Sequence, residues 1–154
     1  MTETRLDIRP AVAADLPTLI ALYADDDLGK LREDAQSLVT QRYVDAFDTI
    51  TRDPNHHLVV GVIDSQIVAT LLLSFLPGLS RNGARRGQIE AMRVARARRG
   101  QGLGRQMLDW AIANARDKGC DLVQLTSDKQ RPAAPRVYDN AGFEASQCGF
   151  KLKL

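Results

Sequence analysis

The spacing of hydrophobic residues alternates along the chain between the periods typical of strands and of helices. A period of two, or a short apolar run, predicts strands over residues 5–9, 57–63, 67–75, 87–95, 121–126 and 149–154. A period near 3.6 predicts helices from Asp15 to the acidic loop at Asp25, from about Gln36 to Arg52, over 102–118, and from Pro132 or Pro135 to about Gly142. This order favours a mixed α/β fold, with helices on both faces of a central mixed sheet.

Turn-forming residues separate these elements. Asp64-Ser65-Gln66 lies between two apolar runs and predicts a β-hairpin, while Pro77–Gly83 predicts a loop. Lys118-Gly119 is typical of a helix C-terminus. With 154 residues, no internal repeat and no long linker, we expect a single domain over residues 1–154.

The composition, 44% hydrophobic and 26% charged, is that of an ordinary globular protein. Its two cysteines, Cys120 and Cys148, are too few for a disulfide framework and match no zinc spacing. We therefore expect reduced thiols in a cytoplasmic protein, and no metal site. The longest apolar run, Ile67–Leu73, is far shorter than the roughly 20 residues of a membrane-spanning helix, and the N-terminus has no signal-peptide pattern. No membrane partner is expected.

Positive charge is concentrated in one window of the chain. Between Arg81 and Arg105 there are eight arginines and one carboxylate, Glu90, so this window carries +7 in a chain whose formal net charge is +2. A basic island on an acidic remainder predicts a local anionic ligand, with a basic surface that binds nothing as the alternative. Nucleic acid is not the expected partner, because only 5% of the residues are aromatic and none lies between Leu76 and Met107.

The segment Val94–Gly104 joins a predicted strand to a predicted helix and contains three glycines and three arginines. Glycines let several backbone N–H groups face one anion, and the following helix N-terminus adds unpaired donors and a favourable dipole. The segment therefore predicts a pyrophosphate site, with a glycine-rich turn that binds nothing as the alternative. It has neither the Gly-Lys-Ser/Thr of a P-loop nor the glycine spacing of the dinucleotide fingerprint.

At these residues the sequence resembles the GCN5-related N-acetyltransferase (GNAT) family. Arg99-Gly100-Gln101-Gly102-Leu103-Gly104 is similar to the family's Arg/Gln-x-x-Gly-x-Gly/Ala signature. The segment from Tyr138 to Phe143 resembles its Tyr-x-x-x-Gly-Phe, and Ile8-Arg9-Pro10 resembles its N-terminal opening. The chain departs from the pattern at Arg131, where many members carry an asparagine that contacts the cofactor. The resemblance implies the splayed sheet of the acyl-CoA N-acyltransferase fold.

The resemblance also implies a reaction, in which an amine directly attacks acetyl-CoA within a ternary complex. Backbone groups of Met92 and Val94 would hold the pantetheine arm, and the loop would hold the pyrophosphate. The residues expected to bind the cofactor are Met92, Arg93, Val94, Arg98, Arg99, Gly100, Gln101, Gly102, Leu103 and Gly104.

Two side chains match the family's catalytic positions. An alkylamine has a pKa of about 10 and must be neutral to attack, so a general base is useful. Glu90 fits the position where many members of the family carry such a base. An ion pair between Glu90 and Arg86 or Arg93 is the alternative. Tyr138 fits the residue that protonates the departing CoA thiolate, with a core aromatic as the alternative.

The acceptor is expected to be the primary amine of a small cationic molecule. In this fold the connection between the first two helices borders the acceptor cleft, and here it contains Asp25, Asp26 and Asp27. A solvated acidic loop is the alternative. A CoA-binding module without chemistry and a nucleic-acid-binding regulator are the alternative functions. The C-terminal run Phe150–Leu154 suggests a homodimer formed through an exposed strand.

Overall fold

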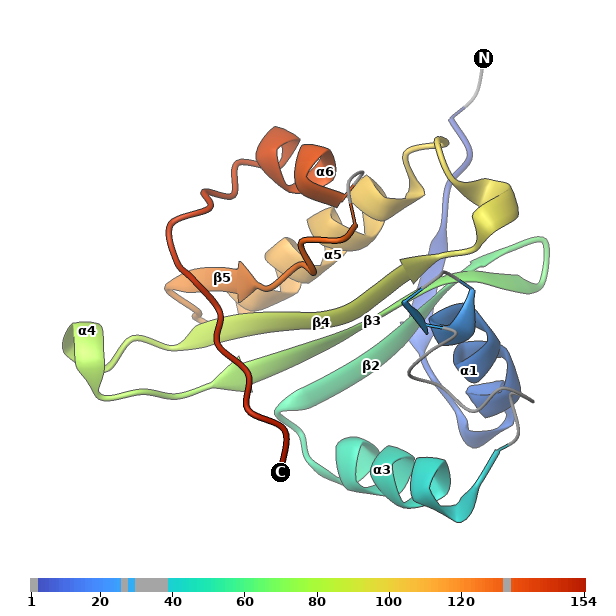
Figure 1. Ribbon diagram of the computed structural model, residues 1–154, viewed down its shortest axis with the longest axis horizontal. Coiled ribbons are helices and arrows are strands. Elements are labelled where there is room, and N and C mark those ends of the chain that lie inside the picture. Colours follow the sequence, from blue (N-terminus) through green and yellow to red (C-terminus); the bar gives the residue numbers. More distant parts are fainter. Residues whose placement is uncertain (1–2, 26–27, 30–38, 132–133) are drawn as a thin grey trace.

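A single open sheet of five strands organises the computed structural model, which describes residues 3–25, 28–29, 39–131 and 134–154 (Figure 1). The strands are β1 (Asp7–Pro10), β2 (His56–Ile63), β3 (Gln66–Leu76), β4 (Arg86–Val94) and β5 (Leu122–Leu125), and they lie side by side in chain order. Neighbours from β1 to β4 are antiparallel, while β4 and β5 are parallel. The sheet is therefore mixed, as expected.

Helices cover both faces of this sheet. They are α1 (Leu16–Ala24), α3 (Gln41–Arg52), the single turn α4 (Ser80–Gly83), α5 (Leu103–Asp117) and α6 (Ala134–Asn140). Figure 1 shows α1 and α3 on one side of the sheet and α5 and α6 on the other. The predicted α/β architecture is confirmed.

Alternation along the central strands explains the two layers. Leu71 of β3 packs with Met107 of α5 in one buried cluster. Val60 of β2 packs with Leu19 of α1 and Phe47 of α3 in a second cluster on the opposite face. Because successive side chains of a strand point to opposite faces, the nearly continuous apolar runs of β2 and β3 supply both cores.

The second half of β4 separates from β5. The two strands pair only where Arg86–Ile89 face Leu122–Leu125, although β4 continues to Val94. On its other side, β4 stays paired with β3 as far as Val94, with a shift of register beside Ala91, whose φ is 50°. A bulge of this kind bends a strand and increases its twist. The edge of β4 beyond Ile89 is thus left open toward α5 and α6.

Two predictions about the elements are wrong. Residues 149–154 form no strand, because a strand needs the backbone groups of a neighbour and none lies beside this segment in the part of the chain that the structure describes. The second helix begins at Gln41 and not near Gln36, since Thr40 has an extended backbone with ψ 164°. Residues 36–38 lie outside the described residues. No described helix is long and apolar enough to cross a membrane.

Candidate active site

The open edge of β4 presents the backbone groups of Met92 and Val94. The N–H of Ala95 donates to Val68 on the β3 side at 2.8 Å, and alternate residues of a strand direct their polar groups to opposite edges. Met92 and Val94 therefore face the gap toward α6, as expected for residues that pair with pantetheine. Arginines hold both carbonyls: Arg93 Nη1 donates to Met92 O at 2.9 Å, and Arg99 Nε donates to Val94 O at 3.3 Å.

The loop that follows β4 has the geometry of an anion cradle. After the short turn Arg96–Arg98, Gly100 and Gly102 both adopt φ 78°, a left-handed conformation that side-chain-bearing residues disfavour. Gly102 is the N-cap of α5 and has no side chain with which to accept a hydrogen bond from the first N–H groups, and the first turn of α5 contains no acidic residue. The first N–H groups of a 15-residue helix thus meet a glycine-rich turn, which is a favourable place for a phosphate.

Gly104 forms the floor of the gap between β4 and α6. A Cβ atom at this position would lie 3.9 Å from Met92 Cε and Val94 Cγ2, and 4.0 Å from Val137 Cγ1. These are ordinary contact distances, so there is room here for either of the residues that the family signature allows, glycine or alanine. The open strand edge, the glycine turn and the helix N-terminus together fit the pantetheine and pyrophosphate of acetyl-CoA.

Asp25 ties the end of α1 to this loop. Its Oδ2 accepts a hydrogen bond from the Arg96 N–H at 3.0 Å, and its Oδ1 lies 3.5 Å from Arg96 Nε. Its backbone carbonyl accepts from Arg99 Nη2 at 3.1 Å. The carboxylate of Asp25, which the sequence places near the acceptor, therefore contacts the loop that is expected to bind the cofactor. Asp26 and Asp27 lie outside the described residues.

Glu90 lies on the face of the sheet that α1 and α3 cover. It is paired across the sheet with Leu72, which packs against the α1–α3 cluster, and its own side chain is exposed. Directly opposed residues share a face. Among the described residues Glu90 forms no salt bridge, so the alternative ion pair with Arg86 or Arg93 is not formed.

Tyr138 lies on the opposite face, in α6. It packs against the α5 cluster and makes an edge-on contact with Phe143, with ring centroids 6.2 Å apart. Burial raises the pKa of its phenol above the usual value, while the charges of Arg93 and Arg131 act in the opposite direction. A phenol is already protonated at neutral pH, and the upward shift of its pKa keeps this proton available to donate.

The structure brings together residues that pattern analysis separates. Arg93 and Arg131 are 38 positions apart in the chain, yet both charges act on Tyr138. Because side chains alternate along a strand, the side chain of Arg93 leaves β4 on the face opposite to those of Met92 and Val94. Its guanidinium reaches the gap because the long side chain bends back to Met92 O. The one sequence signal was the departure at Arg131. Gln101 and Leu103 lie on the loop and at the start of α5 as expected, while Arg98 is half-buried in the preceding turn.

The described residues support neither a metal site nor a nucleophilic cysteine. Among residues 3–25, 28–29, 39–131 and 134–154, no three His, Cys, Asp or Glu side chains are grouped closely enough to hold a metal ion. Cys120 is half-buried, and burial raises the pKa of its thiol, which disfavours a nucleophilic role.

Comparisons with known proteins agree with this geometry. The model of the acetyltransferase (GNAT) family matches residues 19–143. The aminoalkylphosphonate N-acetyltransferase of Salmonella typhimurium is 30% identical over 114 residues, which cover 74% of this chain and 73% of that protein.

Solved structures extend the likeness over almost the whole chain. A Bacillus halodurans C-125 protein described as a transcriptional regulator is 42% identical with a TM-score of 0.93, covering 97% of this chain and 100% of that one. A putative acetyltransferase from Agrobacterium tumefaciens is 29% identical with a TM-score of 0.83, covering 96% and 99%. The chain therefore belongs to the GNAT family and is an acetyl-CoA-dependent N-acetyltransferase.

Proposed function

We propose that this enzyme acetylates the primary amine of a small molecule that also carries a phosphonate or phosphate group. The observation that carries the proposal is the pair of guanidinium groups, Arg93 and Arg131, whose charges act on Tyr138. Tyr138 occupies the position from which the family protonates the CoA thiolate. Two positive charges therefore act at the place where the CoA thiolate would leave.

Arg93 can change partners when acetyl-CoA binds. Its Nη1 now donates to Met92 O, one of the two carbonyls at the open edge of β4. A pantetheine amide that pairs with this carbonyl would replace this contact of Nη1, which could then turn to an anionic acceptor in the gap. Arginine presents a planar fork of donors that matches phosphonate and phosphate oxygens. The aminoalkylphosphonate substrate in the name of the Salmonella relative agrees with this assignment.

A purely cationic acceptor, the expectation from the acidic loop, has less support. The Asp25 carboxylate is engaged by the Arg96 backbone and side chain and cannot bind an ammonium group at the same time without losing these contacts. The cations near this site are Arg93, Arg96 and Arg99, so a cationic amine would be repelled by their guanidinium groups although the exposed carboxylate of Glu90 would attract it.

The proposed reaction uses groups on both faces of β4. The acceptor amine approaches from the Glu90 side and gives a proton to that carboxylate, directly or through water, as its nitrogen bonds to the acetyl carbon. The Met92 N–H, which lies at the open edge of β4, polarises the thioester carbonyl. As the carbon–sulfur bond breaks, Tyr138 gives its phenolic proton to the CoA sulfur, and the two products leave.

A panel of acceptors tests the substrate class. Acetyl transfer is followed as release of the free CoA thiol, with 2-aminoethylphosphonate, ethylamine and spermidine as acceptors. We expect kcat/KM for the phosphonate to exceed that for ethylamine at least ~100-fold, since two charge-assisted contacts contribute about 1.5–3 kcal/mol each. Arg131→Gln should reduce this preference, because it lowers kcat/KM for the phosphonate much more than kcat/KM for ethylamine.

The other outcomes contradict the proposal in distinct ways. A preference for spermidine would return the assignment to the acidic loop and a cationic acceptor. Binding of acetyl-CoA without transfer to any amine would indicate a CoA-binding module that lacks chemistry.

The one-domain organisation and the cytoplasmic location stay predictions, the latter supported by two cysteines that form no disulfide.

A further inference from the structure

A row of polar side chains crosses the sheet beside Glu90. Gln88 of β4 lies opposite Gln124 of β5 and, on its other side, opposite Ser74 of β3. Directly opposed residues share a face, and so do residues two apart on one strand, so these side chains leave the sheet on the same side as Glu90. Residues two apart along a strand are separated by about 6.6 Å. The row therefore runs next to the proposed base.

Gln88 and Gln124 contact one another where their two strands part. Gln124 Nε2 donates a hydrogen bond to Gln88 Oε1 at 2.6 Å. The pairing of β4 with β5 ends one residue later, at Ile89 and Leu125, and β4 continues without β5 as far as Val94. The two side-chain amides thus lie at the closed end of the gap that is expected to receive the pantetheine arm.

This amide pair keeps hydrogen-bonding groups that no described residue uses. A glutamine amide has one oxygen that accepts and an NH2 group that donates twice, so a single bond between two amides leaves one oxygen free, whichever amide is the donor. In the structure the free oxygen is Gln124 Oε1. Ser74 does not fill it, because its Oγ lies 2.7 Å from His56 Nδ1. Both glutamines are half-buried, and a polar group that is withdrawn from water favours a hydrogen-bond partner.

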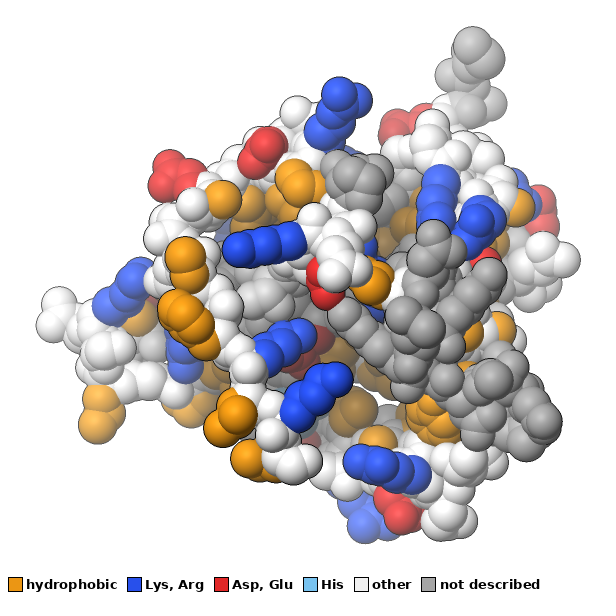
Figure 2. Space-filling model, in the orientation of Figure 1, with side chains coloured by type: hydrophobic (Ala, Val, Ile, Leu, Met, Phe, Trp, Pro, Cys, Tyr) orange, Lys and Arg blue, Asp and Glu red, His pale blue; other side chains and the backbone are white. Residues whose placement is uncertain are grey.

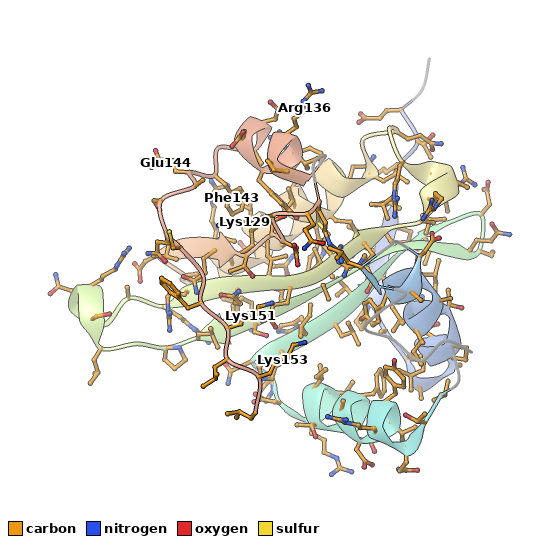
Figure 3. All side chains as sticks on the ribbon, in the orientation of Figure 1. Lys129, Arg136, Phe143, Glu144, Lys151 and Lys153 are labelled. Atoms are coloured by element: carbon orange, nitrogen blue, oxygen red, sulfur yellow. The ribbon has the colours of Figure 1, made fainter. Side chains whose placement is uncertain are left out.

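Basic side chains lie on the surface in front of the sheet. The C-terminal segment, residues 144–154, leaves α6 beside β5 and crosses in front of the strands (Figure 1). Figure 3 locates Lys151 and Lys153 on this segment, and Figure 2 shows further basic side chains, in blue, over the middle of the same face. Ammonium and guanidinium groups donate hydrogen bonds and accept none. An amine that reaches Glu90 therefore needs another group to accept its second N–H.

We propose that the Gln88–Gln124 amide pair selects primary amines, because its free oxygen accepts the amine N–H that Glu90 does not take. This inference rests on the proposed function, in which the amine attacks acetyl-CoA beside Glu90. Gln124 and Glu90 are diagonal neighbours on adjacent strands, a separation that long side chains can span, so one nitrogen can contact both.

The two N–H groups of a neutral primary amine have different fates in this reaction. The nitrogen lone pair forms the bond to the acetyl carbon, the carbon–sulfur bond breaks, and one proton passes to Glu90. The second hydrogen stays on nitrogen and becomes the N–H of the product amide, so the glutamine oxygen can hold it from substrate to product. A secondary amine gives its single N–H to Glu90 and turns an alkyl group toward the glutamine oxygen, which is then left without a partner.

Two matched pairs of acceptors test this selection. 2-Aminoethylphosphonate is compared with its N-methyl derivative, and ethylamine with N-methylethylamine, by release of the free CoA thiol. In both pairs kcat/KM of the parent enzyme should favour the primary amine roughly 10-fold, the effect of one hydrogen bond left unmade.

Methionine at both positions removes the amides with little change in side-chain length. The double substitution Gln88→Met with Gln124→Met should reduce the ratio of primary to secondary kcat/KM to below about 3-fold, because only the primary amine loses a contact. Gln124→Glu should keep the ratio of the parent, since a carboxylate oxygen also accepts an N–H. Gln41→Met is the matched control, because Gln41 Nε2 likewise donates to a neighbouring side chain, Asp45 Oδ1 at 2.8 Å, but in α3. It should leave the ratio unchanged.

A purely structural role of the amide pair gives a different result. If the pair only joins β4 to β5, the double variant has a lower melting temperature and lower rates with both kinds of amine, but an unchanged ratio, which overturns the proposal. A parent enzyme without the ratio, or a Gln124→Glu variant that loses it, overturns the proposal as well, and neither result requires the double variant to fold. A ratio that holds for ethylamine without any preference for the phosphonate would contradict the proposed substrate class and support the selection by the amide pair.

Discussion

The environment of individual side chains decides the chemistry of this site. Tyr138 is the clearest case, because two influences on its pKa oppose one another and burial prevails over the two arginine charges. The phenol, which is protonated at neutral pH in any case, therefore loses its proton only at a pH above the usual range. Glu90, by contrast, is exposed on the other face of β4, where a base can exchange its proton with water. The proposed proton donor and the proposed base are thus separated by the strand that would hold the cofactor.

Replacing Tyr138 by phenylalanine should lower kcat by ~10-fold or more, with the affinity for acetyl-CoA nearly unchanged. Deprotonation removes the proton to be donated, and the raised pKa places this event above about pH 10. The ratio of parent to variant kcat should therefore stay constant from pH 6 to 9 and decline only above that. Steady-state rates across this range are the measurement; equal rates at pH 7 would remove Tyr138 from the mechanism.

At the scale of elements, the anion loop depends on two glycines that play different parts. Gly102 is left-handed, with its nearest neighbour, Glu3 Oε1, 4.0 Å from an added Cβ, so conformation and not space requires glycine there. Gly104 lies within α5 and faces Met92 and Val94 at contact distance. Asp25 adds the third component by tying α1 to Arg96. Helix, loop and strand edge are thus held in one arrangement before acetyl-CoA arrives.

The two glycines provide a matched pair of alanine substitutions. Gly102→Ala should lower the free energy of unfolding by about 1–2 kcal/mol, because an L-residue disfavours the left-handed region. Gly104→Ala should leave it unchanged or raise it by up to about 1 kcal/mol, because alanine is the better helix former. Urea unfolding at neutral pH measures both. An equal loss in the two variants would contradict the assigned conformations.

For the whole molecule, most of the basic window lies where the sheet opens. Five of its eight arginines lie at the end of β4, in the loop and at the start of α5: Arg93, Arg96, Arg98, Arg99 and Arg105. The other three lie in α4 or near the start of β4, and the acidic remainder is distributed over the other elements. Such a distribution attracts a polyanionic cofactor to one end of the sheet. If the pantetheine arm pairs with the open edge of β4 as we propose, this arm distinguishes acetyl-CoA from anions that have no amide groups.

Acetyl-CoA should therefore raise the melting temperature more than a simple polyanion does. At 100 times its Kd it should add about 2.7 kcal/mol of stability, which corresponds to roughly 5–11 °C for a domain of this size. Tripolyphosphate at the same concentration, which contacts the loop alone, is the control and should give a much smaller shift. Equal shifts with the two ligands would mean that the β4 edge does not bind the cofactor.

The sequence alone determined the element types, the layered mixed sheet and the anion loop, because each depends on residues close together in the chain. Hydrophobic period, glycine spacing and the arginine window are all local signals. The strand predicted at 149–154 is wrong for the complementary reason: its alternation is genuine, but a strand also needs a neighbour to pair with, and no described strand pairs with this segment. Only the tertiary structure placed Arg93 and Arg131 beside Tyr138, engaged Asp25 with Arg96, and set Glu90 and Tyr138 on opposite faces of β4. These contacts join residues that are distant in sequence, and they follow from the bend of β4 away from β5 and from side-chain reach, which no periodicity encodes.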